Sequence, residues 1–435
     1  MTPLVPLLLW GWIPLSIYFF SKYTPQRASL LVLVGGVLFL PHIPNSLYHL
    51  PVVTITKNII LSFALLVGIV SSPKARKYKF KLEKYDYPIL LWCSVVPIFS
   101  ALSNRLGFYH GFNLAINQGL RWGVFYYVGR RFFTEEEHFT DICYAIIWGG
   151  ILYVPLCLYE VMESPLLSIN LYGFFAHDWA QHIRKGGYRP IVFMQHGLML
   201  SLWMAFSAIV SFWFWKVKRI KKLLKVPLFI VSVTLIVMTY YTKSSGAFLF
   251  MFLVIAFAYI YSGPKSNKYI KIIIMILFIY MFTRITMLLS STFMATYLSK
   301  IFGPARIQSL WFRLYQEEVL SRNMRGKYLF GWGGLGRGLQ GGVGIVDAMW
   351  LIYYNLYGLF GLFTLYTTML IGPWLLVRKN IKLPVEVIIL SLIIIVFMID
   401  CLLNAMNNPV YIMIAGALVS YNIELRNKKI ILCDQ

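Results

Sequence analysis

The stretch GKYLFGWGGLGRGLQGGVGIVDAMWLIYYNLYGLFGL, residues 326–362, contains the two kinds of segment from which this chain is built. Its first part is a loop rich in glycine. At Asp347 it changes into an apolar, aromatic run that continues to residue 376 and is long enough to cross a bilayer core of about 30 Å. Apolar runs of about 18 residues recur from one end of the chain to the other. This repetition predicts a polytopic α-helical membrane protein.

The composition excludes an ordinary soluble protein. Hydrophobic residues make up 59% of the 435 residues and charged residues only 13%, with a mean hydropathy of +0.69. A soluble chain of this length would form two or three domains with far more polar surface. We therefore expect an all-α transmembrane helical bundle that forms a single membrane domain over residues 1–435. About 12–13 spans are predicted, near residues 4–20, 29–42, 53–71, 87–103, 112–128, 139–159, 190–212, 226–241, 245–262, 271–289, 347–376, 384–403 and 408–422.

Lysine and arginine predict the orientation of the bundle. One alternating set of loops, together with the C-terminal tail, holds 25 Lys and Arg, whereas the short loops of the other set hold 2. The first set and the C-terminus are therefore expected in the cytoplasm, and the N-terminus outside. The net charge of +24 could indicate a nucleic-acid partner. Cytoplasmic loops that face anionic lipids are the simpler explanation, so no nucleic acid is expected.

Two long loops, 161–189 and 290–346, are expected on the outer side, and long loops usually carry function. In the second loop, apolar residues recur at helical spacing from Ile307 to Leu314. This pattern predicts an amphipathic helix on the outer membrane surface. Arg313 lies on its polar face, where Glu317 is its expected partner.

The same loop carries an excess of positive charge, with seven Lys and Arg against two Glu before Asp347. Arginine forks match phosphate oxygens, so the excess favours an anionic ligand bound by Arg306, Arg313 and Arg337. The glycines of the quoted stretch allow a ligand to approach the backbone closely, although a simple turn back to the bilayer would also use them. The candidates of this kind are Gly331, Gly333 and Gly334.

Asp347 begins the apolar run that follows. It could accept a proton from a sugar hydroxyl. It could equally be the N-cap of the helix, and both interpretations stay open.

The segment RPIVFMQHG, residues 189–197, begins another predicted span. Pro190 suits the first turn of a helix, which would place Arg189 at the outer surface and His196 about two turns deeper. A histidine inside a membrane is a functional candidate, and a single hydrogen bond to a neighbouring helix is the alternative. Lys243 lies in a very short outer turn.

Three further charged residues fall inside or near the ends of predicted spans. Arg121 and Arg284 are expected to extend toward the membrane surface, Arg121 on the inner side and Arg284 on the outer side. Asp400 is expected to pair with an outer arginine. The five cysteines and seven histidines show no ligand spacing, so no metal or other cofactor is expected.

At these residues the chain resembles the O-antigen ligase and O-antigen polymerase superfamily, polytopic glycosyltransferases that use lipid-diphosphate-linked glycans on the periplasmic side. The resemblance covers roughly residues 180–375. It rests on pieces in the expected order: Arg189 with His196 and Gly197, the outer turn 242–247, Arg306 and Trp311, the motif YLFGWGGLG, and Asp347 with Gly358.

The sequence departs from the family pattern at two positions. Asp347 stands where ligases carry a histidine, and Ser245 stands where the family carries an arginine, with Lys243 two residues before it. These departures favour a polymerase, or a relative that attaches another glycan, over a strict ligase.

The resemblance implies metal-independent transfer of polyprenyl-diphosphate-linked oligosaccharide units to a glycan or lipid-glycan acceptor. The reaction would occur at the outer face of the bacterial cytoplasmic membrane during surface polysaccharide synthesis, with other polysaccharide-assembly proteins as candidate partners. Arg189 and Arg306 would bind the diphosphate, supported by Lys243 and Arg337, and Asp347 or His196 would activate the acceptor. A lipid-linked glycan flippase or polysaccharide exporter is the alternative, and a non-catalytic assembly partner is a third possibility.

Overall fold

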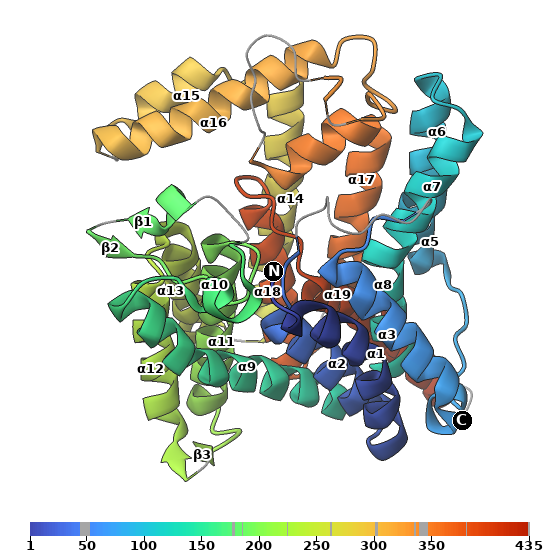
Figure 1. Cartoon of the computed structure of the whole chain (residues 1–435). Helices are drawn as coiled ribbons and strands as arrows, with labels where there is room; N and C mark the ends of the chain where they lie inside the picture. Colours follow the sequence, from blue (N-terminus) through green and yellow to red (C-terminus); the bar gives the residue numbers. More distant parts are fainter. Residues whose placement is uncertain are drawn as a thin grey trace.

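The fold is almost entirely helical (Figure 1). The computed structural model describes residues 1–43, 53–175, 179–184, 186–223, 225–261, 263–300, 303–334, 336–338, 347–379 and 381–433. Each of the thirteen predicted spans coincides with a helical segment in these ranges, which confirms the all-α fold. The segments are α1 (Leu4–Lys22), α2 (Pro25–Phe39), α3 (Lys57–Ser71), Lys84–Ser103, 108–132, α9 (Glu136–Met162), α11 (Gly197–Lys216), α12 (Leu228–Tyr241), α13 (Ser245–Ile260), α14 (Asn267–Ile285), α17 (Met349–Arg378), α18 (Val385–Asp400) and α19 (Pro409–Cys433).

Two of these segments contain π-helical turns. The first consists of η1 (Lys84–Asp86), α5 (Tyr87–Leu90), the π-helical η2 (Leu91–Val95) and α6 (Val96–Ser103). The second consists of α7 (Phe108–Gln118), the π-helical η3 (Gly119–Gly123) and α8 (Val124–Phe132).

The connecting segments contain further helices, of which α16 is long, and two antiparallel hairpins. The helices are α4 (Pro73–Arg76), α10 (Leu167–Tyr172), η4 (Trp179–His182), η5 (Pro264–Ser266), α15 (Ser291–Leu298) and α16 (Pro304–Asn323). The hairpins are β1 (Ile183–Arg184) with β2 (Gly187–Tyr188), and β3 (Lys222–Leu223) with β4 (Val226–Pro227).

Five helical segments in the described ranges are long and apolar enough to cross a membrane: α1, Lys84–Ser103, α9, α11 and α17. Four further apolar helices, α2, α3, α12 and α13, have 10–17 residues. These helices are compatible with a membrane protein, and the count of 12–13 spans stays a prediction.

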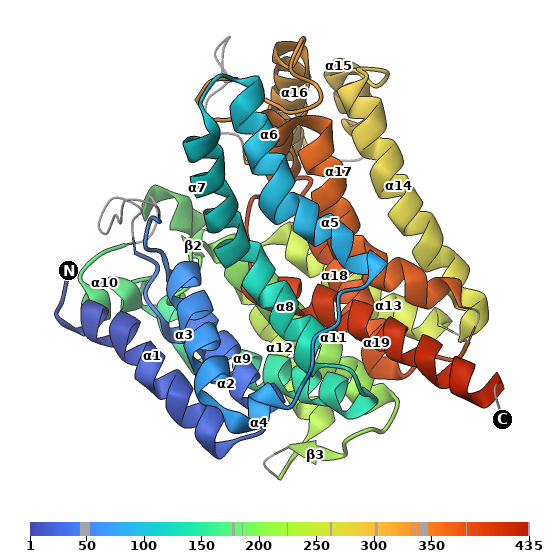
Figure 2. The same ribbon diagram turned by 90° about the vertical axis from the view of Figure 1, so that its right-hand side faces the viewer.

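The loops of the two predicted sets lie at different ends of the molecule. Helices α15 and α16 lie at the top of Figures 1 and 2, whereas the basic β3–β4 hairpin and the C-terminus lie toward the bottom in both views. The N-terminus lies beside α10 in the first long loop, because the Thr2 N–H donates to the Tyr172 carbonyl at 3.0 Å. The orientation of these two ends relative to a membrane stays a prediction.

The core lies where α11, α18 and α19 meet. The side chains along α11 and α18 are almost all buried. The ring of Tyr411 in α19 packs against Phe206 of α11 and Phe397 of α18, at centroid distances of 5.2 and 4.8 Å. By contrast, α12, α13 and α14 expose many large apolar side chains, which is the pattern of helices that face lipid.

A buried ion pair fastens α16 to α14. Nε of Arg284 lies 2.6 Å from Oε2 of Glu317, and the Tyr280 hydroxyl donates to both oxygens of the same carboxylate at 3.0 Å. The predicted pairing of Glu317 with Arg313 is therefore wrong, because Glu317 faces α14 and not the surface of its own helix. Arg284 does not extend to the outer surface either, because Glu317 and the Leu314 carbonyl accept its hydrogen bonds.

The amphipathic helix of the second long loop is confirmed as α16, but its apolar residues are distributed differently from the prediction. Leu314 is buried, whereas Trp311 is exposed and stacks on Tyr315. The buried face of α16 is therefore the face that carries Glu317 and packs against α14. The aromatic residues of α16 point outward.

The glycine loop packs into a break in α17. Gly358 has a φ of +66°, which interrupts the helix, and Gly331 and Gly333 have φ values of +66° and +68°. The N–H groups of Trp332 and Gly333 donate to α17 carbonyls at 2.8 and 3.0 Å. In return, the N–H groups after the break, at 359 and 360, donate to carbonyls of the loop at 2.6 and 3.1 Å. Backbone groups freed by the break are thus satisfied by the loop.

We predict that Gly358→Ala destabilises the protein. A Cβ at this position would lie 2.5 Å from the carbonyl oxygens of Tyr328 and Leu329, and the left-handed backbone adds about 1–3 kcal/mol of strain. Thermal unfolding in detergent should show a lower midpoint. The control is Gly246→Ala in α13, where no atom lies within 4 Å of the added methyl group, so its midpoint should be unchanged or slightly raised. An unchanged midpoint for Gly358→Ala would contradict the tight contact.

Candidate functional site

The segment before α11 is irregular and held in place by Glu160. This side chain is fully buried at the end of α9, and its carboxylate accepts hydrogen bonds from the N–H groups of Leu167, Ile191 and Val192 at 3.2, 2.8 and 2.7 Å. Val192 has a φ of +54°, which no helical residue adopts. The predicted helix start at Pro190 is therefore wrong.

His196 is the N-cap of α11 and does not lie two turns inside it. Its Nδ1 accepts a hydrogen bond from the Leu198 N–H at 3.0 Å. Its Nε2 lies 3.4 Å from Oε1 of Gln181 in η4, and its ring centre lies 5.8 Å from that of His182. The histidine thus links the helix start to the first long loop.

Arg189 is buried in the same place, with about 1% of its surface exposed. Its Nε donates to the Thr242 carbonyl at 3.4 Å. Its side chain lies against Gly197, where a Cβ would approach its Cδ to 2.5 Å, so only glycine fits there. Nη1 of Arg189 is buried and has no hydrogen-bond partner among the described residues. A buried guanidinium N–H without an acceptor is costly, so this group is available to a bound anion.

Lys243 joins Arg189 from the turn between α12 and α13. Its φ is +55°, and its Nζ lies directly against Gly187 of the β1–β2 hairpin. Arg184 of β1 is close enough to Arg189 to act on it electrostatically. Arg184, Arg189 and Lys243 are called the cation cluster below.

Burial lowers the pKa of two side chains in the cation cluster. Burial, and then the positive charge of Arg184, lower the pKa of Arg189 to about 10. Burial also lowers the pKa of Lys243. Burial disfavours the charged form of each side chain, and an anion bound beside them would offset this effect.

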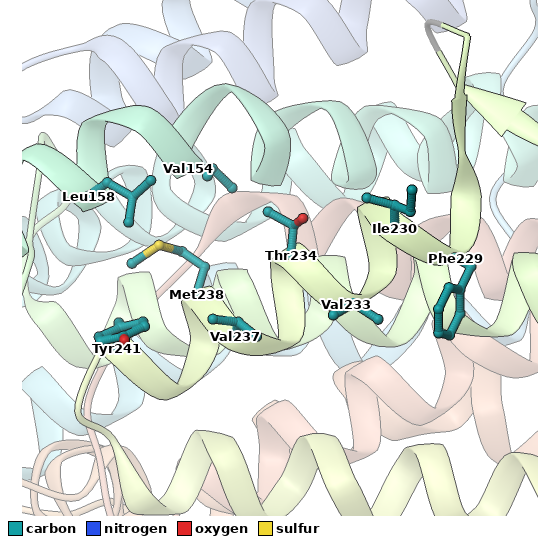
Figure 3. A pocket seen from close by; sticks show the side chains of 9 residues that line it. All are labelled: Val154, Leu158, Phe229, Ile230, Val233, Thr234, Val237, Met238 and Tyr241. Atoms are coloured by element: carbon teal, nitrogen blue, oxygen red, sulfur yellow. The ribbon is translucent and has the colours of Figure 1, made fainter.

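An apolar groove lies between α9 and α12 (Figure 3). Its volume is about 340 Å³. The nine residues that line it are Val154, Leu158, Phe229, Ile230, Val233, Thr234, Val237, Met238 and Tyr241. Along the chain, Tyr241 is two residues from Lys243 and Leu158 is two residues from Glu160. One end of the groove is therefore close along the chain to Lys243 of the cation cluster, and an apolar groove of this kind suits a lipid chain.

The glycine loop is used differently from the prediction. The N–H groups of Gly331 and Gly333 already donate to protein carbonyls, which gives both glycines a structural role. Gly334 accepts a hydrogen bond from the Arg337 N–H through its carbonyl at 3.3 Å, and the Arg337 side chain is exposed. Contacts of these residues with a diphosphate stay a prediction.

Asp347 is exposed and lies just before α17, whose N-cap is Ala348. The interpretation of Asp347 as the N-cap is therefore wrong, and a role toward an acceptor stays a prediction. Residues 349 and 350 donate to carbonyls at 404 and 401, so the start of α17 lies beside the end of α18.

The remaining predicted residues lie around α16. Arg313 is close enough to Asp400 for an electrostatic attraction, although no ion pair forms within 4.0 Å, and the Asn404 amide donates to Asp400 at 2.7 Å. The side chain of Arg306 and residues 339–346 lie outside the described part of the chain. The structure thus brings together Arg189, His196 and Lys243, and it places Asp347 and Arg313 in a second group near α18.

Arg121 is a candidate that the sequence interpretation underrated. It lies in η3, and its Nε is buried without a partner among the described residues. Tyr353 and Tyr357, in the first turns of α17, interact with it electrostatically. The expectation that it extends to the inner surface is therefore wrong. The π-helical turns η2 and η3 pack against each other here, and such turns are frequent at functional sites.

Sequence reasoning also missed Glu160, Gln181 and Arg184. A carboxylate at the end of an apolar run is a signal that could have indicated Glu160. No group of three or more His, Cys, Asp or Glu side chains in the described residues could hold a metal ion.

Comparison with known proteins gives no identification. The chain matches no family model, no curated protein and no solved structure. The resemblance to O-antigen enzymes therefore stays an inference from the motifs.

We predict that Glu160→Gln destabilises the segment before α11. A glutamine amide offers one acceptor oxygen, so at least one of the three N–H groups would lose its partner, at about 1–3 kcal/mol. The unfolding midpoint in detergent should fall. Glu163→Gln, an exposed position one turn further on, should leave the midpoint unchanged. Equal midpoints for the two variants would refute the role given to Glu160.

Proposed function

We propose that this protein is an integral membrane glycosyltransferase that polymerises or transfers polyprenyl-diphosphate-linked oligosaccharide units at the outer face of the cytoplasmic membrane, with polymerisation favoured. The proposal is supported by the cation cluster together with the apolar groove, whose lining residue Tyr241 is two residues from Lys243 along the chain. A buried Nη1 without an acceptor, a partly buried lysine and an apolar groove together suit a diphosphate attached to a long lipid chain.

The reaction breaks the bond between the anomeric carbon of the donor sugar and the lipid diphosphate, and forms a bond to the acceptor hydroxyl oxygen. Negative charge grows on the leaving diphosphate, so fixed cations beside it lower the barrier. Arg189 and Lys243 supply this charge in the proposal. Arg306, Arg313 and Arg337 are candidates for further contacts with the diphosphate or the glycan from the second long loop.

The acceptor hydroxyl must lose its proton as the new bond forms. Asp347 is the proposed base because it is exposed at the start of α17 and free of an N-cap role. His196 is the second candidate, and its Nε2 faces Gln181 of the first long loop. In this proposal the donor lies along the α9–α12 groove and the acceptor reaches it from the side of α17.

The proposed orientation places the cation cluster outside. The short loops that carry most of the lysines and arginines would then face the cytoplasm, as the positive-inside rule requires. The N-terminus, next to α10, would lie outside together with the β1–β2 hairpin.

The first experiment is to delete the gene and then extract and size the lipid-linked glycans and the surface polysaccharide. Single repeat units on lipid, with surface polymer lost, support a polymerase. Full-length polymer that remains on its lipid carrier indicates a ligase. Units trapped on the cytoplasmic leaflet indicate a flippase and overturn the proposal. A non-catalytic assembly partner would tolerate loss of Arg306 and Asp347 together.

We predict that Lys243→Gln and Arg189→Gln, each returned to the deletion strain, reduce polymer formation about 100-fold, because a fixed charge beside the leaving group is lost. Single lipid-linked units should accumulate in both strains. The control is Lys300→Gln, an exposed lysine of the second long loop. Because Arg189 is buried, its variant could fail to fold, so protein levels are measured and the partly exposed Lys243 decides the outcome. Normal polymer with Lys243→Gln would exclude the cation cluster from the reaction.

We predict that Thr234→Trp impairs use of the lipid-linked donor by filling the groove. If the indole displaces two methylene groups of the lipid, donor affinity falls about tenfold. Binding of a polyprenyl diphosphate to the purified protein measures the effect. Ile272→Trp places the same indole on the exposed face of α14 and should leave binding unchanged. Equal affinities for the two variants would show that the lipid lies elsewhere.

A further inference from the structure

A second pocket, with charged side chains among its lining residues, lies between the end of α17 and the C-terminal half of α19. Its volume is about 280 Å³. It is lined by Tyr85, Leu375, Arg378, Lys379, Asn422 and Arg426. The C-terminus that follows α19 lies toward the bottom of Figure 2, away from α15 and α16. The pocket shares no lining residue with the cation cluster.

Positive charge exceeds negative charge in this pocket. Three of the six lining side chains are cationic, and Glu83 is the one carboxylate that pairs with them in the described residues, at 3.1 Å from Nη2 of Arg426. Nζ of Lys379 donates to the backbone carbonyl of Asn422 at 2.9 Å, which fixes the lysine at the rim. Arg378 is exposed and forms no ion pair with any described residue.

Two buried polar atoms of the residues that line the pocket lack partners. Nε of Arg426 and Oδ1 of Asn422 are both inaccessible to solvent and have no hydrogen-bond partner among the described residues. Cations at the end of α17 would offset its helix dipole without any ligand. The dipole of α17 does not explain why Arg426, which belongs to α19, has a buried donor without a partner.

The unsatisfied atoms define the chemistry of a ligand. A guanidinium donor flanked by two more cations suits the oxygens of a phosphate. The acceptor oxygen of Asn422 suits a hydroxyl group next to that phosphate. Leu375 and the ring of Tyr85 add apolar surface at the same place.

We propose that this pocket binds a phosphate group that carries a neighbouring hydroxyl, the chemistry of a glycerophosphate. An anionic phospholipid head group of the inner leaflet and a free glycerol phosphate share this chemistry. The proposal is independent of the glycan-transfer function, because it concerns a pocket that shares no lining residue with the cation cluster.

The test measures binding to the purified full-length protein in detergent by native mass spectrometry. The probes are phosphatidylglycerol, phosphatidylcholine and free glycerol 3-phosphate. Phosphatidylglycerol should bind more tightly than phosphatidylcholine. Arg378→Gln should weaken its binding about tenfold, because one charge-assisted hydrogen bond is lost. Arg426→Gln should weaken it at least as much.

The matched control is Lys222→Gln, an exposed lysine of the β3–β4 hairpin, which should bind all probes as the unaltered protein does. Arg378→Gln keeps the test decisive if the Arg426 variant fails to fold, because the Arg378 side chain is exposed and forms no ion pair in the described residues. Free glycerol phosphate that binds with the same dependence on Arg378 would identify a soluble ligand for the same site. Equal binding of both lipids, or equal binding by Arg378→Gln and Lys222→Gln, would overturn the proposal.

Discussion

Three hydrogen bonds from backbone N–H groups to the Glu160 carboxylate hold the candidate site together. Away from water, an irregular backbone needs a substitute for the hydrogen bonds of a helix. Glu160 provides it, and the chain can then remain irregular through residues 189–196 before α11 begins. Without this support, Pro190 would favour a helix start seven residues earlier. Arg189 and His196 would then occupy different positions.

The position of Arg189 depends on a second close contact. Its side chain passes over Gly197, and its Nε donates to the carbonyl of Thr242 at the end of α12. This contact brings the segment before α11 against the turn between α12 and α13, which carries Lys243. Two cations far apart in sequence are thus brought close to each other. Burial disfavours the charged form of each, and a bound anion would offset this effect, which is the physical basis of the proposed diphosphate site.

The two proposed anion sites are built from different structural elements. The cation cluster is built on an irregular segment and two tight turns, and its Lys243 is close along the chain to the apolar groove. The pocket between α17 and α19 is built at helix ends, where lysine and arginine also interact favourably with the helix dipole. A protein with a net charge of +24 has many cations, so position alone does not mark a site. Each of the two places also holds a buried guanidinium N–H without an acceptor among the described residues, on Arg189 and Arg426, a feature shared only with Arg121 among the described arginines.

The sequence by itself determined the helical architecture. Hydrophobic runs predicted a helix at every span, because burial and backbone hydrogen bonding in an apolar environment leave the helix as the available conformation. It also indicated Arg189, His196 and Lys243 as candidates. Only the tertiary structure decided their partners. Glu317 pairs with Arg284 and not with Arg313, the glycine loop fills a break at Gly358, and α11 begins at Gly197. Periodicity and loop charge describe each segment alone, whereas these contacts depend on which buried polar groups meet when the helices pack.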